Sequence, residues 1–321
     1  MKARRKKSES GVVLIAVLGG ILLLMMIVFA LSSSVRVGAE ELQNRKEQLQ
    51  AYYLARGGVF TSSWLLSQMS TAPDSVVHPG QQFIEWELAN GKVHVDMTDE
   101  SGKIDINRAE QPLLEKLLVA LGYELDAARP LATAMVDWRN PSSLARWESA
   151  QASGNLLDYD PTRSTQYTYH AVEEILNVPG MKPDIFYGHY VRHKDGKVER
   201  LPGLIDCVTV DSGTVRININ YAPYPVLLAV TDMNTGTADY IVAGRAGKPF
   251  ASVDEVTHEF PGSLSGETLS GLTTQSSGNF TLLASGQTRA GIVARIRAVV
   301  KVQGVVDGPF QILRWKDSHV Q

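Results

Sequence analysis

The sequence of 321 residues has a single cysteine and no excess of positive charge. Cys207 cannot form a disulfide within the chain, so a location outside the cytoplasm would rest on core packing alone. We interpret this thiol, in the segment LIDCVTV, as a small apolar side chain of a strand. The formal net charge of −3 gives no support to nucleic acid as the main partner.

Motifs that carry known chemistry are also lacking. The sequence contains no glycine-rich phosphate loop, no HExxH motif, no CxxC pair and no GxSxG nucleophile elbow. His189 and His193 are four residues apart, a spacing that would let both face a metal from one helix. We interpret them instead as solvated histidines near a turn. We therefore expect a protein that is not an enzyme.

One long apolar run lies close to the N-terminus. It extends over residues 12–31, about twenty residues, which is enough to span a bilayer as a helix. Five basic residues precede it and are expected to hold the N-terminus in the cytoplasm: Lys2, Arg4, Arg5, Lys6 and Lys7. A cleaved signal peptide usually has a shorter apolar core. The small residues of FALSSS leave that interpretation open as an alternative.

The helical pattern continues beyond the apolar run. Residues 32–70 carry apolar side chains in a loose helical rhythm, and Pro73 in TAPD is expected to stop the helix. The sequence therefore predicts one helix of about 55 residues, apolar all round in its first half and amphipathic in its second. Such a helix suits a subunit that packs among neighbouring helices at one end and carries its own globular domain at the other.

The remaining chain predicts an α+β fold. Residues 71–103 contain two alternating strands around an Asn90-Gly91 turn, and residues 276–321 contain three more strand-like runs. Helical signals dominate residues 104–275. We therefore expect a small antiparallel sheet into which a large all-α domain is inserted.

The expected helical domain contains an imperfect internal repeat, at about 104–183 and 214–262. KIDINRAEQPLLEKLLVALG aligns with VRININYAPYPVLLAVTDMN, so that Asn107 matches Asn220 and Pro112 matches Pro225. We expect each asparagine to cap the helix that follows it. The Pro-Gly pairs at 179–180 and 261–262 are expected to end helices in a hairpin, which is typical of helix–hairpin–helix-like (SAM-like) units.

The junction SESG–VVLIAVL resembles the cleavage site of prepilins, a class that includes type IV pilins and type II secretion pseudopilins. The resemblance implies that residues 1–11 are a basic leader, that a prepilin peptidase cuts after Gly11, and that Val12 becomes N-methylated. Most members carry a glutamate at the fifth mature position, where it would neutralise a neighbouring amine in an apolar environment. This chain has Ala16 there.

The leader, the missing glutamate and the phrases INRA, MVDWR, AVEEILNVPGM and ININYAPYPVLLAV occur in an order that resembles the protein K family of minor pseudopilins. The resemblance covers nearly the whole chain. It implies a pilin-like fold and a tip subunit that primes pseudopilus assembly and supports export of folded proteins. Within the helix, packing would involve Leu14, Gly19, Gly20, Leu24 and Ile27, where the glycines let helices approach closely.

The same resemblance implies the surroundings of the protein. The expected partners are minor pseudopilins of the protein I and protein J types, the major pseudopilin, the prepilin peptidase and the inner-membrane secretion platform. The expected location is the bacterial inner membrane, crossed once, with the N-terminus in the cytoplasm and the globular part in the periplasm.

No cofactor is required by the sequence, but family members can bind calcium. The nearest oxygen ligands are Asp158 and Asp160 in LLDYDPT, with Asp137 as a distant third, although a charged surface loop explains them as simply. Many members carry a more acidic stretch after Trp138, where this chain has RNPSS. The segment DMNTG, at Asp232, resembles part of a calcium loop, and we interpret it as a turn between helices.

Two alternative functions stay open. The second repeat also resembles the module of competence receptors, which favours a membrane-anchored helix–hairpin–helix protein that takes up DNA. Against this, the turns VPGMKPD and FPGSLSG contain one lysine between them, and the net charge is negative. A minor pilin of a related type IV pilus machine would share the same architecture.

Overall fold

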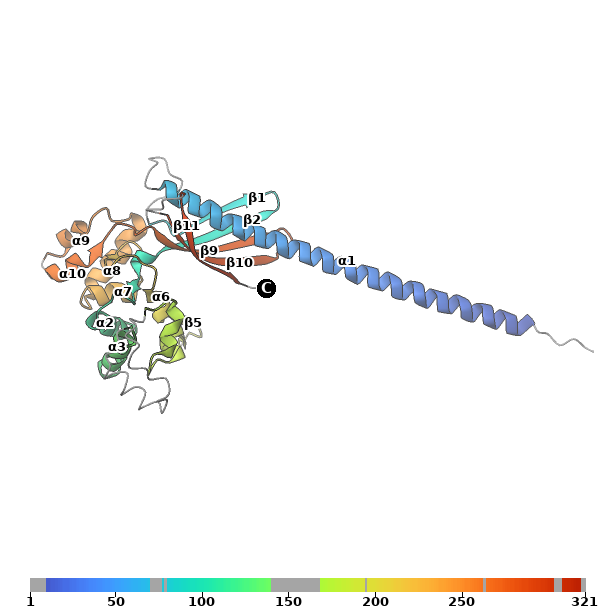
Figure 1. The fold of residues 1–321 in the computed structure, drawn as a ribbon, viewed down its shortest axis with the longest axis horizontal. Helices are drawn as coiled ribbons and strands as arrows, with labels where there is room; N and C mark the ends of the chain where they lie inside the picture. The colour runs from blue at the N-terminus through green and yellow to red at the C-terminus, as the bar shows by residue number, and fades with distance from the viewer. Residues whose placement is uncertain are drawn as a thin grey trace, which may run out of the picture.

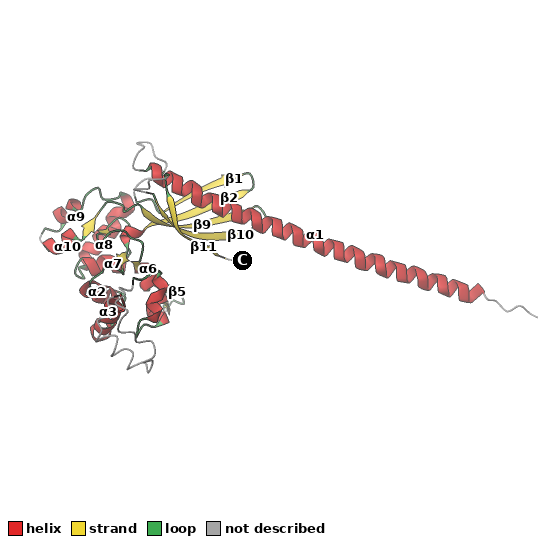
Figure 2. Ribbon diagram, viewed as in Figure 1, coloured by secondary structure: helices red, strands yellow, loops and turns green. Residues whose placement is uncertain are grey.

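The computed structural model consists of a long helix, a five-stranded antiparallel sheet and a body of short helices (Figure 1). The helices of the body gather at the end of the sheet that lies away from the free half of the long helix (Figure 2). The structure describes residues 10–69, 77, 80–139, 168–193, 195–261, 264–302 and 308–318.

Helix α1, Ser10–Gln68, is 59 residues long and confirms the predicted single helix. Its N-terminal half extends away from the rest of the protein (Figure 1). Its C-terminal half lies on the sheet, where Ala51, Ala55 and Val59 are fully buried. The apolar run ends at residue 31, whereas burial against the sheet begins at Ala51, so the first part of the amphipathic segment is still exposed.

The sheet has the strand order β1-β2-β9-β10-β11. The strands are β1 (Phe83–Leu88), β2 (Gly91–Asp99), β9 (Asn279–Thr288), β10 (Val293–Lys301) and β11 (Gln311–Ser318), and every neighbouring pair is antiparallel. Val95, Leu282 and Ile296 are fully buried and belong to the apolar face on which α1 packs. The strands predicted on both sides of the helical region are thus confirmed.

The hairpin β1–β2 turns one residue earlier than predicted. Leu88 pairs with Gly91, so the turn consists of Ala89 and Asn90, and Gly91 is the first residue of β2. A Cβ atom on Gly91 would lie 2.0 Å from the carbonyl oxygen of Gln287, and its φ is +154°. Glycine is therefore required at position 91 because β9 approaches closely and because the backbone φ is positive. A place at the centre of the turn is not the reason.

Residues 100–278, called the helical body below, connect β2 to β9. Its first half contains η1 (Glu100–Gly102), β3 (Ile104–Asp105), α2 (Gln111–Ala120), α3 (Leu125–Arg139), η3 (Val172–Asn177), α5 (Pro183–Tyr187), β4 (His189–Arg192), β5 (Val198–Leu201), α6 (Leu204–Cys207) and β6 (Val208–Thr209). Its second half contains β7 (Ile217–Asn218), α7 (Tyr224–Val230), α8 (Thr235–Gly247), α9 (Asp254–Glu259), α10 (Gly266–Ser270) and β8 (Leu272–Thr273).

The expectation of an all-α insertion is wrong in one respect. The short strand β3 pairs in parallel with β6, β7 pairs in parallel with β8, and β4 and β5 form an antiparallel hairpin. The two-residue strands are too short to show an alternating pattern, and each pairs with a strand far away in the sequence. The strands β6 and β8 also lie beyond the ranges 104–183 and 214–262 expected for the repeats.

The two halves of the helical body repeat the same hydrogen bonds. The Asn107 side chain accepts a bond from the backbone N–H of Tyr169 at 2.7 Å and donates one to its carbonyl at 2.9 Å. The Asn220 side chain does the same with Phe250, at 2.8 and 3.0 Å. Neither asparagine caps the following helix, so that prediction is wrong: the N-cap residues of α2 and α7 are Glu110 and Pro223.

An arginine in each half completes the correspondence. Arg139, at the end of α3, donates to the carbonyl oxygens of Ile106 and Ala109. Arg245 in α8 donates to those of Ile219 and Ala222 at 2.8 and 2.7 Å. In both halves these bonds satisfy carbonyls beside the matched asparagine. The repeat seen in the sequence is therefore a repeat of hydrogen bonds between asparagine or arginine side chains and the backbone.

Candidate functional site

The free half of α1 exposes a large apolar surface. Leu14, Leu24 and Ile27 are 68%, 60% and 55% exposed, although side chains of this kind normally avoid water. Large exposed apolar surfaces mark membrane or protein contacts. Within the described residues, one helix, Val13–Gln68, is long and apolar enough to cross a membrane, and none of its most apolar 18-residue stretch is buried. This helix fits a single-pass membrane anchor.

The predicted processing and packing residues all lie at the start of this helix. Gly11 and Val12 belong to the first turn of α1, where only the backbone is described. Ala16 is exposed, and a Cβ atom on Gly19 or Gly20 would meet nothing within 4 Å. This part of the helix is therefore open to a neighbouring helix on every side.

The residues considered for calcium are not brought together in the described parts of the chain. Asp158 and Asp160 lie outside the described residues, and Asp137 lies within α3. Asp232 forms an ion pair with Lys116 and accepts a 3.0 Å hydrogen bond from the Thr268 hydroxyl, contacts that hold the pKa of its carboxyl below the usual range. The segment DMNTG joins α7 to α8, which confirms its interpretation as a turn.

The two histidines and the cysteine have structural surroundings. His189 begins β4 and His193 follows it, and both are exposed on the β4–β5 hairpin, so they do not share a helix face. The His193 Nε2 atom lies 2.7 Å from a Glu199 oxygen. Cys207 is fully buried, as predicted for an apolar side chain, but it ends helix α6 instead of lying in a strand. Burial raises the pKa of its thiol to about 12.

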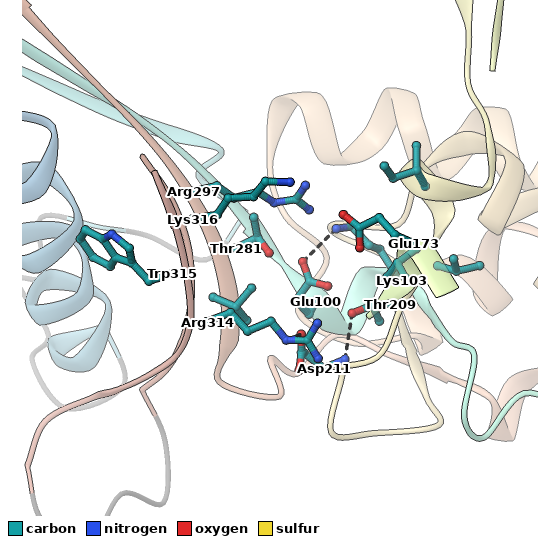
Figure 3. Close-up of a pocket in the computed structure, with 14 residues that line it drawn as sticks. Glu100, Lys103, Glu173, Thr209, Asp211, Thr281, Arg297, Arg314, Trp315 and Lys316 are labelled. Atoms are coloured by element: carbon teal, nitrogen blue, oxygen red, sulfur yellow. Dashed lines mark hydrogen bonds and ion pairs between the residues drawn. The ribbon is translucent and has the colours of Figure 1, made fainter. Parts of the chain in front are cut away.

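A charged cleft between the outer face of the sheet and the helical body was not predicted (Figure 3). It has a volume of about 430 Å³. On its floor the Lys103 ammonium donates to Glu100 at 2.8 Å, and beside them Arg314 of β11 pairs with Asp211 at 3.1 Å. The Arg314–Asp211 pair joins β11 of the sheet to the helical body, and the Lys103–Glu100 pair lies within the helical body beside it, which indicates a structural joint.

The local environment sets the charge of the acidic groups at this joint. Burial alone would raise the pKa of Glu100, but the Lys103 ammonium and hydrogen bonds from Thr209 and Thr281 hold it below the usual value. Burial raises the pKa of the neighbouring Asp99, whose carboxylate accepts a bond from the Ser101 hydroxyl at 2.6 Å. Sequence patterns do not reveal this site, because DESGK has the composition of an exposed turn.

The wall of the cleft formed by the sheet is basic. Arg297 of β10 lies directly opposite Lys316 of β11, and both line the cleft (Figure 3). Glu173 lies on the facing wall, on the helical body. Like charges in directly opposed positions weaken strand pairing.

A long N-terminal helix on a small antiparallel sheet, with a helical body inserted between two strands, matches the pilin-like fold that the resemblance in the sequence implies. A family model described as "Type II secretion system (T2SS), protein K" matches residues 217–275, the second half of the helical body. The chain is 21% identical over 272 residues to the type II secretion system protein K of Pseudomonas aeruginosa, which covers 78% of this chain and 77% of the relative.

A solved structure with a similar fold comes from the GspK–GspI–GspJ complex of the type 2 secretion system of enterotoxigenic Escherichia coli. The TM-score is 0.60 at 16% identity, over 87% of this chain and 99% of that one, which shows a shared fold. The resemblance to the protein K family of type II secretion is therefore confirmed.

Proposed function

We propose that this chain is the minor pseudopilin at the tip of a type II secretion pseudopilus. The observation that carries the proposal is helix α1, whose exposed apolar half continues without a break into the half that holds the sheet. A subunit of this shape is anchored in the membrane by one end and carries its globular part on the other. The similarity to protein K supports the secretion system as its setting.

The first twelve residues carry the proposed processing of the N-terminus. A prepilin peptidase cuts after Gly11, Val12 becomes the methylated N-terminus, and the basic leader keeps that end in the cytoplasm until the cut. The sheet and the helical body then lie in the periplasm. In this orientation the helical body is the part farthest from the membrane, since it lies beyond the sheet at the far end of α1 (Figure 1).

The tip position is supported by Ala16 and by the bulk of the helical body. A subunit with no neighbour above it has no amine to neutralise, so a glutamate at position 16 would leave an unpaired charge in an apolar environment. The two repeated units are proposed to be helix–hairpin–helix-like modules that act as a cap on the filament. Their role is structural and not catalytic.

Assembly would proceed through the apolar half of α1. The related structure is a complex with GspI and GspJ, which supports protein I- and protein J-type subunits as partners of this chain. Leu14, Leu24 and Ile27 would pack against their helices, while Gly19 and Gly20 permit close approach. The complex would prime addition of the major pseudopilin on the inner-membrane platform and so support export.

Replacement of Gly11 by valine tests the proposal. We expect the precursor to remain uncut in cells that contain the prepilin peptidase, and secretion to stop. Mass spectrometry of the N-terminus and the amount of exported protein give the two measurements. Gly247→Val is the matched control, since a Cβ atom there meets nothing within 4 Å and the site is far from the leader. A methylated mature N-terminus in the Gly11→Val variant would overturn the proposal.

A further inference from the structure

Three charged side chains of the charged cleft have no ionic partner. Arg297 and Lys316 lie on the wall formed by the sheet, and Glu173 lies on the facing wall (Figure 3). Within the described part of the chain none of the three forms an ion pair, whereas the other charged groups that line the cleft are paired with one another. The cleft therefore presents two free positive charges opposite one free negative charge.

The fold holds the two cations side by side. Arg297 and Lys316 are directly opposed residues of β10 and β11, so both side chains project from the same face and their Cβ atoms lie about 5 Å apart. Two like charges this close repel each other, and an anion between them relieves the repulsion. An arginine offers a planar fork of donors and a lysine a compact one, a combination that suits carboxylate groups.

Two attachments fix the helical body on the sheet and keep the cleft open. The Asn279 side chain of β9 donates a 2.6 Å hydrogen bond to the carbonyl oxygen of Asp211, whose carboxylate also pairs with Arg314 at 3.1 Å. The second attachment is the Tyr221 hydroxyl, which accepts a 2.7 Å bond from the backbone N–H of Gly80, in the segment that leads from α1 to β1. The free charges on the two walls are therefore neutralised by a ligand and not by closure of the cleft.

The rest of the lining limits the size and the charge of that ligand. The volume of about 430 Å³ is near the lower end of the range of about 300–1,000 Å³ that is typical of small-molecule sites. Val172 and Ile205 of the helical body line the cleft and offer apolar surface to a short aliphatic stem. A dianion such as phosphate would face the Glu173 carboxylate with no positive group of its own. The cleft therefore suits a small molecule with charges of both signs.

We propose that the charged cleft binds a short acidic peptide with a free amino group. Two carboxylates of the ligand pair with Arg297 and Lys316, and its ammonium group pairs with Glu173. Its two negative charges and one positive charge match the two positive charges and one negative charge that the cleft leaves free. The inference does not depend on the proposed function, which assigns no small-molecule ligand to this chain.

Binding of the dipeptide alanylglutamate tests the inference, because this probe carries one ammonium and two carboxylate groups at neutral pH. Isothermal titration calorimetry is carried out on the full chain in an uncharged detergent at low ionic strength. We expect a dissociation constant below about 1 mM for a ligand of this size.

Three comparison probes separate the charges of the ligand. N-acetylalanylglutamate lacks the ammonium group and should bind about fivefold more weakly than alanylglutamate. Alanylglutamine lacks the side-chain carboxylate and should bind about tenfold more weakly, since a contact between arginine and a carboxylate is stronger than most. Inorganic phosphate, which has no positive group, should also bind at least about tenfold more weakly.

Substitutions assign each charge of the cleft. In Glu173→Gln the preference for alanylglutamate over its acetylated form should disappear. Arg297→Gln should weaken binding of alanylglutamate about tenfold, and Lys316→Gln is a second variant of the same wall. The matched control is Arg295→Gln, which should leave the dissociation constant unchanged, because Arg295 is exposed two residues away on the same strand and does not line the cleft. Thermal unfolding shows that each variant keeps its fold.

Four outcomes would overturn the inference. No binding of alanylglutamate up to about 10 mM would show that the cleft is not a site for this ligand. Equal affinity for phosphate would indicate a simple anion site. Equal losses in Arg295→Gln and Arg297→Gln would indicate a diffuse basic surface, and a preference for the free ammonium that survives in Glu173→Gln would remove that residue from the site. In each case the proposed function stands, because none of these measurements concerns secretion.

Discussion

Lys103 donates a 2.8 Å hydrogen bond to Glu100, and the two side chains are only 10% and 4% exposed, at the point where the sheet meets the helical body. A buried ion pair of this kind costs more to break from one side than to remove as a whole, because the remaining charge is left without a partner. Both residues belong to the helical body, and Glu100 also accepts a hydrogen bond from Thr281 of β9, which links the pair to the sheet.

Breaking this pair from one side should destabilise the protein strongly. Glu100→Gln or Lys103→Met should each lower the free energy of unfolding by about 3–5 kcal/mol, while the double variant should lose less than the sum of the two. Urea unfolding of the soluble part is the measurement. Glu267→Gln, on the exposed helix α10, is the control. Additive losses would show that the two groups do not depend on each other.

Acid should remove the contribution of Glu100. Its pKa is held below the ordinary value of 4.5, so the ion pair stabilises the fold fully above pH 4.5 and loses that effect as the pH falls through the lower folded value. The difference in unfolding free energy between wild type and Glu100→Gln should therefore be largest at neutral pH and shrink below pH 4.5. A difference that is constant down to pH 2 would contradict the assigned environment.

Replacement of the two matched asparagines should destabilise the protein to different extents. Asn220 is almost fully buried and Asn107 is half-buried, although both make the same two backbone bonds. Replacement by alanine leaves two buried backbone groups without partners, at a cost of about 1–3 kcal/mol. We expect Asn220→Ala to lie at the upper end of this range and Asn107→Ala at the lower end, by thermal unfolding. The reverse order would mean that water replaces the Asn220 side chain readily.

The alanine at position 16 should matter for assembly and not for folding. Ala16→Glu adds an unpaired carboxylate to the apolar half of α1, at a cost of about 2.5–3.5 kcal/mol if it lies deep in the membrane. We expect normal cleavage of the leader but less export of secreted protein. Ala16→Leu should behave as wild type. Full export by the Ala16→Glu variant would remove the argument that connects this residue with the tip.

The parts of the fold that could be predicted are those with a repeated local pattern. The length of α1 follows from its apolar run and helical rhythm, and β2 and β10 show alternating side chains. The repeat was visible because Asn107 and Asn220 stand in similar phrases. Their role was not predictable, because the residue that Asn107 binds, Tyr169, is 62 positions away in the chain.

The charged cleft could not be predicted for the same reason. Glu100, Lys103 and Asp211 are polar residues of turns, and nothing in their neighbours shows that a sheet face will cover them. Their burial depends on Arg314 and Thr281, which belong to strands at the other end of the sequence. Local patterns determine elements, whereas contacts between distant segments determine which charges are buried.

The helical body leaves and re-enters the sheet at one point, since Asp99 at the end of β2 lies opposite Phe280 at the start of β9. Without the body, these two strands would still be adjacent and could be joined by a tight turn into an ordinary hairpin. The helical body can therefore change in size or be replaced during evolution while α1 and the sheet stay the same. A subunit within a filament and a subunit at its end could then share α1 and the sheet, and differ only in the segment that joins β2 to β9.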